Sequence, residues 1–485
     1  MRLRFRTACS GLACALLVSL GCQKSPPSTA PPNVLLIVVD TLRWDRLGCY
    51  GNQRGLTPFL DRLSARGFRF HQAYAASSWT RPSVASIFTS RYPSQHGAVT
   101  ILNKIDDQEL TLAKVLKELG YATGAVSGSP IISAASGFAQ GFDRFDEFPW
   151  RDKVRVDPIK ARALAWLDRV WPSSGKPVFL YLHLMEPHGP YKPPEPYHTR
   201  FRRGPRLSDA MVNRKLMRAW GEFMKRGNAE GFRQFNATEI AVMASLYDGE
   251  VASLDAELEH LFQELDRRRF LDNAVVVITS DHGEEFYEHG GTWHGVTLYN
   301  ETIQVPLLVV PPGDGGARPV EGNVSLVDVA PTILELLHAP APPAFEGHSF
   351  ARRIERRSWL GARWTGFWET AHDDVEALSE LELSGGHPKA LPKHTRALVR
   401  RSLKVLTQPG GGTESYDLAQ DPGEQRPNLP ALAESSAALL DELRRRYAQL
   451  AERASPPAES FELDDATKDR LRALGYAVDA ANGGR

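Results

Sequence analysis

Short apolar runs recur along the chain, and two of them lead directly into acidic residues. One run covers residues 34–39 and is followed by Asp40, and another covers 274–279 and is followed by Ser280 and Asp281. β-Branched runs without polar alternation are typical of strands buried on both faces of a parallel sheet. Ligands bind beyond the carboxyl ends of such strands. We therefore expect Asp40, Asp281 and the adjacent His282 to meet at one edge of one sheet.

Strand and helix patterns alternate through the first two thirds of the chain, which predicts a doubly wound α/β domain. After residue 339 the pattern changes to short strand-like runs followed by one long helix, which predicts a small antiparallel sheet with a covering helix. The expected strands of the first part lie at 121–126, 178–183 and 305–310, and its helices at 58–65, 110–119, 157–170, 238–266 and 328–337. In the second part we expect strands at 364–368, 396–406 and 414–417 and a helix at 429–453.

The amino terminus has the pattern of an export signal. Three arginines precede an uncharged run that ends at Gly21-Cys22, as in a bacterial lipobox, in which Cys22 is lipidated. An ordinary signal peptide is the alternative. The expected protein is an exported cell-envelope lipoprotein, anchored in the membrane by its lipid and facing the periplasm or lying at the outer membrane. The expected divisions are 1–22 signal peptide, 23–32 tether, 33–345 main domain, 346–455 C-terminal subdomain and 456–485 tail with a short helix.

Charge gives no sign of a nucleic-acid partner. Lysine plus arginine equals aspartate plus glutamate at 58 each, and the basic residues lack interleaved aromatic residues. Residues 198–236 form a basic insertion with ten lysines or arginines against three acids. This insertion is either a rim for a polyanionic substrate or a solvated helical excursion. With Cys22 acylated, Cys49 is the remaining thiol outside the leader, and we expect it to be a buried apolar residue.

Thr80 stands at the start of an apolar helix that has a proline in its first turn, in the sequence Thr80-Arg81-Pro82-Ser83. Proline is tolerated at this position, and the free backbone N–H groups of a first turn favour an anion. The hydroxyl is therefore placed like a nucleophile that faces a sulfate or phosphate group.

Several motifs occur in a fixed order over about residues 33–430. They are 33–43, 48–51, 57–63, 80–91, 187–191, 280–284, 305–307, 328–332 and 416–424. In these motifs and their order the chain resembles the sulfatase branch of the alkaline phosphatase superfamily. The resemblance implies a large, mostly parallel sheet sandwiched by helices, plus a smaller C-terminal antiparallel sheet with a helix.

The resemblance also implies a reaction centre with one divalent metal ion. Asp40, Thr80, Asp281 and His282 match the ligand positions. In many calcium-dependent members the residue after the second aspartate is asparagine, so His282 favours Mn²⁺, Zn²⁺ or Mg²⁺ without excluding Ca²⁺. His188 and His294 fall where the family places residues that touch the anion or protonate the leaving oxygen. Arg43, Arg81 and His183 are candidates for substrate contacts, and His289 and Glu284 are weaker site candidates.

Thr80 is also a departure from the family pattern. Catalytic sulfatases carry Cys or Ser in this slot and convert it to formylglycine, which is not expected from threonine. A threonine sulfate has no easy elimination route, whereas a threonine phosphate is resolved by attack of water or an alcohol at phosphorus. Val84 and Ser129 stand where relatives have cationic residues.

The predicted function is a metal-dependent hydrolase that cleaves a sulfuric or phosphoric ester with Thr80 as nucleophile. Its expected partner is an anionic ester, with a glycan or lipid headgroup among the candidates. One alternative is a transferase that passes a phosphoglycerol or phosphoethanolamine group to an envelope glycan or lipid. The other is a noncatalytic homologue that binds an anion or glycan. No oligomeric state is predicted.

Overall fold

The structure, a computed structural model, describes residues 30–148, 153–202, 207–226, 229–313, 316, 318–355, 376–382, 394–408 and 411–454. The expected signal peptide with Cys22, most of the tether, the strand-like run 364–368 and the tail 456–485 lie outside these residues. The export signal and the lipid anchor therefore stay predictions. No helix in the described part of the chain is both long enough and apolar enough to cross a bilayer.

Within the described residues, eight strands form the main sheet in the order β10-β2-β9-β6-β1-β5-β3-β4. Strand β9 runs antiparallel to both of its neighbours and the other pairings are parallel, so the predicted mostly parallel sheet is confirmed. The strands are β1 (Asn33–Val39), β2 (Phe68–Tyr74), β3 (Ala122–Ser127), β4 (Arg144–Glu147), β5 (Val178–Leu184), β6 (Ala274–Ser280), β9 (Gln304–Val310) and β10 (Arg318–Ser325). Strands β1, β5, β6 and β9 are buried along their whole length.

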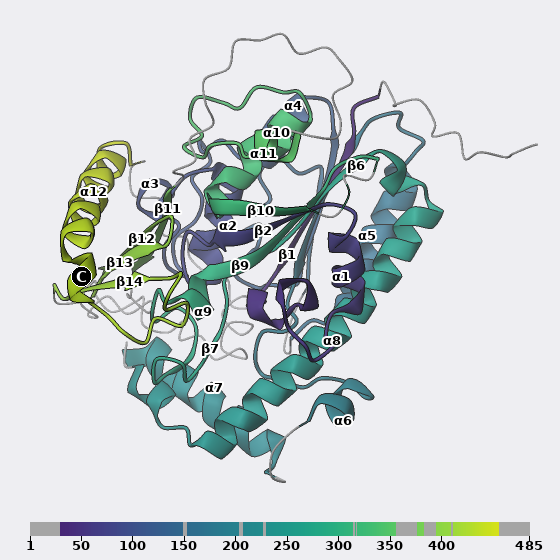
Figure 1. Ribbon diagram of the computed structural model, residues 1–485. Helices are drawn as coiled ribbons and strands as arrows, with labels where there is room; N and C mark the ends of the chain where they lie inside the picture. Colours follow the sequence, from purple (N-terminus) through teal and green to yellow (C-terminus); the bar gives the residue numbers. More distant parts are fainter. Residues whose placement is uncertain are drawn as a thin grey trace, which may run out of the picture.

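Helices cover both faces of this sheet (Figure 1). Helices α1 (Pro58–Ser64), α5 (Val156–Val170) and α8 (Ala237–Arg267) pack together on one face, and α2 (Thr80–Thr89), α4 (Leu112–Glu118) and α10 (Val329–Leu336) pack on the other. Helix α5 buries Ile159, Ala163, Trp166 and Leu167, the spacing of an amphipathic helix on a sheet. Trp166 lies directly over Gly124 of β3, where a Cβ atom would approach the indole to 2.5 Å. The remaining short helices are α3 (Pro93–His96), α9 (Asn300–Ile303) and α11 (Ala351–Glu355).

The basic insertion contains helices α6 (Tyr197–Phe201) and α7 (Asp209–Arg226) and the 3-10 turn η3 (Ala229–Arg233). Its aromatic side chains face inward: Trp220 of α7 lies 5.3 Å from Trp293, and Phe232 of η3 stacks on the same indole at 6.4 Å. The insertion is therefore packed onto the main domain through an aromatic face. The other 3-10 turns are η1 (Trp44–Arg46), η2 (Gly48–Tyr50), η4 (Phe270–Asn273), η5 (Leu326–Asp328) and η6 (Pro430–Leu432).

The C-terminal subdomain has the predicted antiparallel sheet, with strands in the order β11-β12-β13-β14 and helix α12 packed against β12 and β13. The single strand expected at 396–406 is two strands joined by a tight turn, because Arg401 adopts the left-handed conformation with φ of 54°. The elements are β11 (Glu376–Glu382), β12 (His394–Arg400), β13 (Leu403–Thr407), β14 (Thr413–Asp417) and α12 (Ala433–Glu452).

A buried ion pair joins this subdomain to the main domain. The Lys404 ammonium lies 2.6 Å from a Glu424 carboxylate oxygen, and both side chains are fully buried. Lys404 also donates to the carbonyl of Leu298 at 2.8 Å and to Asn300 Oδ1 at 3.0 Å. Glu424 accepts the backbone N–H of Asn300 at 2.6 Å. Because a buried charge is tolerated only when it is paired and hydrogen-bonded, this contact fixes the loop before α9.

Candidate active site

The register of three neighbouring strands brings the sequence-predicted acids together. Strand β1 lies between β5 and β6, with Val38 opposite His183 and Val39 opposite Ser280. Asp40 follows β1 and Asp281 follows β6, so both carboxylates leave the sheet at the same edge. The predicted meeting of the two aspartates is confirmed.

Asp40, His183 and Asp281 form a compact group of metal-ligand type. One candidate ligand atom from each lies within 4.8 Å of the other two, and all three side chains are buried. His183 Nε2 lies 3.4 Å from Asp40 Oδ2. Within the described part of the chain, Asp40 Oδ1 and Asp281 Oδ2 are buried without a hydrogen-bond donor. Orphaned carboxylate oxygens beside an imidazole fit a divalent cation with mixed oxygen and nitrogen ligands.

The two carboxylates respond in opposite ways to their shared burial. Burial raises the pKa of Asp40, but the nearby His188 and the hydrogen bond from His183 outweigh it and hold this pKa below its ordinary value. Burial, followed by the charge of Asp40, raises the pKa of Asp281 well above its ordinary value. Without a cation, the two buried carboxylates therefore repel each other. A bound cation removes this repulsion.

Backbone strain occurs next to the first ligand. Thr41 has a φ of 60°, a left-handed conformation that is costly for a β-branched residue. Its N–H donates to Asp281 Oδ1 at 3.2 Å, and its carbonyl accepts the Tyr247 hydroxyl at 2.7 Å. These bonds hold the strained turn, which aims Asp40 at Asp281.

Thr80 begins helix α2, and its hydroxyl lies 3.3 Å from His282 Nε2. Ser83, one turn further on, donates to the carbonyl of Asp281 at 2.6 Å and so ties the helix start to the end of β6. His282 Nδ1 donates to the carbonyl of Gly283 at 2.9 Å. Its Nε2 therefore carries the lone pair, and it accepts the hydrogen bond from the Thr80 hydroxyl.

The candidate ligand group contains Asp40 and Asp281 of the expected set and adds His183, while the expected ligands His282 and Thr80 are not part of it. His282 Nε2 lies 3.8 Å from Asp40 and 3.5 Å from Asp281, at the border of the group, with its lone pair directed to Thr80. His183, which the resemblance implied as a substrate contact, is one of the candidate ligands. The sequence signal for His183 is an imidazole near the end of an otherwise apolar strand that pairs with the Asp40 strand.

The other two histidines predicted to act at the site, His188 and His294, lie close to each other, and His294 also lies close to His282. The His188 and His294 rings are 5.1 Å apart, and His294 lies 4.5 Å from the ring of His282. Burial lowers the pKa of His188 to about 4 and that of His294 well below its ordinary value. Lys153 holds the His188 turn by donating to the carbonyl of that residue at 2.8 Å and to buried Glu250 at 2.7 Å.

Glu284, a weaker candidate from the sequence, lies at the centre of this histidine group. Its Oε1 lies 2.9 Å from His294 Nδ1, and its Oε2 accepts the Tyr191 hydroxyl at 2.9 Å. Burial raises the pKa of Glu284 to about 7. His294 follows the two-stranded ribbon of β7 (Glu285–Phe286) and β8 (Thr292–Trp293), which brings it back over Glu284.

A family profile described as "Sulfatase" matches residues 32–339, well over half of the chain. The chain belongs to the sulfatase family. Members of this family are ester hydrolases, and this chain is one of them. It is similar to an arylsulfatase of Clostridium perfringens, with 26% identity over 81% of this chain and 89% of the relative. It is also similar to PehA of Trinickia caryophylli, a multifunctional alkaline phosphatase superfamily protein, with 26% identity over 65% of this chain and 76% of the relative.

Solved structures share the fold of this sulfatase. BT4656, solved in complex with its substrate D-glucosamine-2-N,6-O-disulfate, aligns with a TM-score of 0.69 and 19% identity, over 89% of this chain and all of that one. The phosphonate monoester hydrolase of Agrobacterium radiobacter aligns with a TM-score of 0.67 and 20% identity, over 90% of this chain and 98% of that one. These similarities confirm the predicted fold class.

The two arginines expected to contact substrate in this sulfatase are engaged elsewhere. Arg43 is held by Asp45 at 2.8 Å and Glu288 at 2.6 Å and donates to the carbonyl of Glu284. Arg81, which is 1% exposed, donates to backbone carbonyls that include those of Ile131 and Asn103. Its role is to brace the loops around helix α2, because several main-chain acceptors converge on one buried guanidinium.

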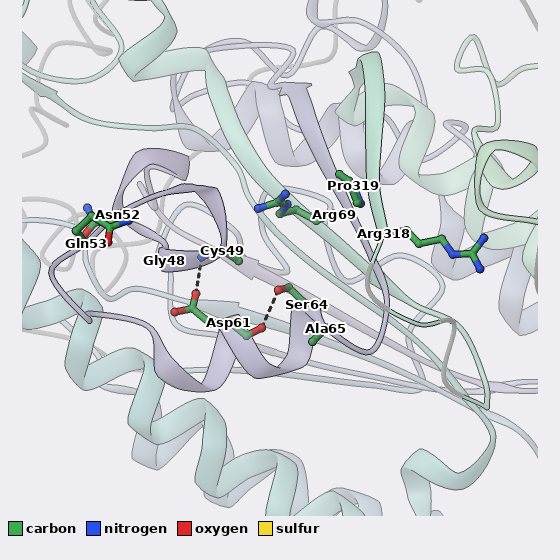
Figure 2. Close-up of a pocket in the computed structure, with 10 residues that line it drawn as sticks. All are labelled: Gly48, Cys49, Asn52, Gln53, Asp61, Ser64, Ala65, Arg69, Arg318 and Pro319. Atoms are coloured by element: carbon green, nitrogen blue, oxygen red, sulfur yellow. Dashed lines mark hydrogen bonds between the residues drawn. The ribbon is translucent and has the colours of Figure 1, made fainter.

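A cleft of about 470 Å³ lies beside the η2 turn and β10, and none of its lining residues belongs to the candidate active site (Figure 2). Cys49 lines this cleft, and burial raises the pKa of its thiol to about 12, so it stays protonated at neutral pH. His289 is likewise outside the centre: it pairs with Glu301 at 2.6 Å and stacks on Tyr299.

Proposed function

We propose that this sulfatase-family chain hydrolyses a monoanionic phosphorus ester, a phosphodiester or a phosphonate monoester, with Thr80 as the nucleophile. The observation that carries the proposal is the hydrogen bond of 3.3 Å between the Thr80 hydroxyl and His282 Nε2, beside two buried carboxylates that have unpartnered oxygens. The shared fold of the phosphonate monoester hydrolase of Agrobacterium radiobacter supports the choice of a phosphorus ester.

Asp40, His183 and Asp281 are the residues that would hold a divalent cation. When bound, the cation supplies positive charge that stabilises the reacting ester oxygens and favours loss of the Thr80 proton. The two aspartate charges balance the two charges of the cation, and Arg43 and Arg81 are engaged elsewhere. This charge balance suits an ester with one negative charge better than a dianion.

The residues of the chain suit a two-step displacement. Thr80 gives its proton to His282 Nε2 and bonds to phosphorus, and the bond from phosphorus to the leaving oxygen breaks as that oxygen takes a proton from His188 or His294. Water then gives a proton to the same histidine and attacks phosphorus, the bond to Thr80 breaks, and Thr80 recovers its proton from His282. Threonine favours phosphorus over sulfur because its ester has no second hydroxyl on the same carbon through which a sulfate could be eliminated.

The test compares 4-nitrophenyl phenylphosphonate, bis(4-nitrophenyl) phosphate, 4-nitrophenyl phosphate and 4-nitrophenyl sulfate, each with Mn²⁺, Zn²⁺, Mg²⁺ or Ca²⁺. We expect the first two esters to be cleaved fastest. Thr80→Ala should lower kcat/KM by about 10³-fold or more, since nucleophile removal leaves only binding and electrostatic terms, while Thr80→Ser keeps the hydroxyl and retains measurable activity. Mass spectrometry of rapidly quenched samples should find the phosphorus group on Thr80. Full activity of Thr80→Ala would exclude this nucleophile, and preference for the sulfate ester would exclude the substrate class.

A further inference from the structure

We propose that Glu284 is a positioning residue that makes His294, and not His188, the proton donor to the leaving oxygen. The inference rests on the proposed function and deepens it, because it separates two histidines that the sequence leaves equivalent. Its structural basis is the chain of hydrogen bonds from Tyr191 through Glu284 to His294 Nδ1, with both contacts 2.9 Å long.

His188 has the wrong tautomer for an acid. Its Nδ1 lies 2.6 Å from the carbonyl oxygen of Gly189. A carbonyl oxygen only accepts hydrogen bonds, so Nδ1 carries the hydrogen. In the neutral ring Nε2 is then a bare lone pair, which accepts a proton or a hydrogen bond but has no proton to give.

His294 differs because its Nδ1 partner is a carboxyl group. The His294 and Glu284 side chains are almost completely buried, so a net charge on the pair is costly. The uncharged pair shares one proton between Oε1 and Nδ1, and whichever atom holds it, the second imidazole hydrogen is on Nε2. Within the described residues His294 Nε2 makes no hydrogen bond, while the ring itself lies 4.5 Å from that of His282, the residue bonded to Thr80. The proton on Nε2 is therefore free to reach a leaving oxygen near Thr80.

The proton balance closes in both half-reactions. As the bond from Thr80 to phosphorus forms, the leaving oxygen departs with the Nε2 proton, and the pair becomes a Glu284 carboxylate that accepts from Nδ1–H. In the second half-reaction the bare Nε2 takes a proton from the attacking water, which restores the uncharged pair. Glu284 thus holds the ring in one orientation and offsets the charge that develops during transfer.

The basic insertion supports this chain from outside. Asn213 of α7 clamps Tyr191 with two hydrogen bonds, of 2.8 Å from the Tyr191 N–H and 2.9 Å to the Tyr191 carbonyl. Trp220 of the same helix lies 6.1 Å from the His294 ring. The insertion therefore positions the proposed acid, a role that its surplus of positive charge does not indicate.

The experiment measures how strongly the rate depends on the leaving group. A phosphonate ester of 4-nitrophenol needs little proton donation, because 4-nitrophenolate is a weak base, whereas the matching ethyl ester needs full donation. For Glu284→Gln and His294→Gln we expect kcat losses of about 10²-fold or more on the ethyl ester and below about 10-fold on the nitrophenyl ester. The double variant should be no worse than His294→Gln, since both changes remove one function.

Controls separate this role from a structural one. His188→Gln should affect both esters equally. Glu285→Gln is the matched control, since Glu285 is also buried but accepts the N–H groups of His289 and Gly291. Metal content and melting temperature are measured for each variant. If Glu284→Gln does not fold, Tyr191→Phe, which removes only the outer hydrogen bond, should still give a selective loss of about threefold on the ethyl ester.

Two results would overturn the proposal. The first is an equal loss on both esters for Glu284→Gln, or for Tyr191→Phe where Glu284→Gln does not fold. The second is a selective loss on the ethyl ester for His188→Gln. Failure of the proposed function itself has a different signature. If the proposed function is wrong, Thr80→Ala keeps its activity on the nitrophenyl ester. If it is right, Thr80→Ala loses activity on this ester, whereas Glu284→Gln keeps most of it.

Discussion

The backbone N–H of Gly295 donates a hydrogen bond of 2.8 Å to the carbonyl oxygen of Ser78. This bond joins the loop that carries His294 to the segment that leads into Thr80. The distance between Thr80, the proposed nucleophile, and His294, the proposed proton donor, is therefore constrained by a main-chain contact. Gly295 has a φ of +71°, and a Cβ atom there would lie 3.3 Å from the Cβ of Trp79.

Gly295→Ala should damage catalysis more than its effect on stability explains. The left-handed backbone costs an L-residue about 1–2 kcal/mol, and the added methyl group pushes the loop away from Trp79. Gly290→Ala is the matched control, because Gly290 has a φ of +80° with nothing near its Cβ position. Urea unfolding should show similar losses for both, while kcat falls only for Gly295→Ala. Equal kcat values in the two variants would contradict this role of the loop contact.

Lys153→Met should destabilise the protein by about 3–5 kcal/mol, the usual result of removing one partner of a buried ion pair, because Glu250 then keeps only the longer ion pair with Arg155 at 3.9 Å. Glu250 is fully buried, and it also accepts the N–H of Lys192 at 2.6 Å. The double variant Lys153→Met with Glu250→Gln should recover part of the loss. Lys160→Met, which removes a more exposed pair with Glu257, should cost under about 1 kcal/mol. Chemical unfolding measures all of these free energies.

Because of His289, the free energy of unfolding should decrease as the pH rises above 6.5. Burial lowers its pKa, but the hydrogen bond to Glu301 outweighs burial and raises the pKa to about 9. The protonated form is thus favoured by folding, so its contribution is complete below pH 6.5 and is lost as the pH rises to about 9. We expect a decrease of about 1–2 kcal/mol across this window in the wild type, and none in His289→Gln. An unchanged slope in that variant would assign the effect to another group.

A divalent cation should stabilise the wild type and fail to stabilise Asp281→Asn. At a concentration of about 100 times Kd, the cation should add about 2.7 kcal/mol to the free energy of unfolding. The substituted amide keeps an oxygen acceptor for Thr41 but removes a like charge from beside Asp40, so the metal-free variant should be at least as stable as the metal-free wild type. Thermal unfolding with and without a chelator checks both. A metal-induced shift that persists in Asp281→Asn would place the cation elsewhere.

The sequence predicted those parts of the site that depend on strand ends. Asp40 and Asp281 follow long apolar strands, and a parallel sheet leaves few other places for them. Strands β2 and β10 were not predicted, because polar residues alternate along them at one edge of the sheet.

The side-chain partners could not be predicted in the same way. Arg43 and Arg81 carry the charge expected of an anion site, yet both are held by acceptors that only the folded chain brings near. Glu284 had the local appearance of an acid at the start of a helix. Its pairing with His294 depends on the ribbon of β7 and β8, which folds the intervening residues back on themselves.

The buried contact of Lys404 and Glu424 with Asn300 has a consequence for how the enzyme is made. Every residue assigned to the chemistry precedes residue 295, but Leu298 and Asn300 gain their buried contacts with Lys404 and Glu424 only when the last strands of the C-terminal sheet have docked. A nascent polypeptide that stops short of Glu424 therefore contains all the proposed reacting groups but lacks these contacts. We expect such a polypeptide to be less active than the full chain, so that activity during synthesis rises late.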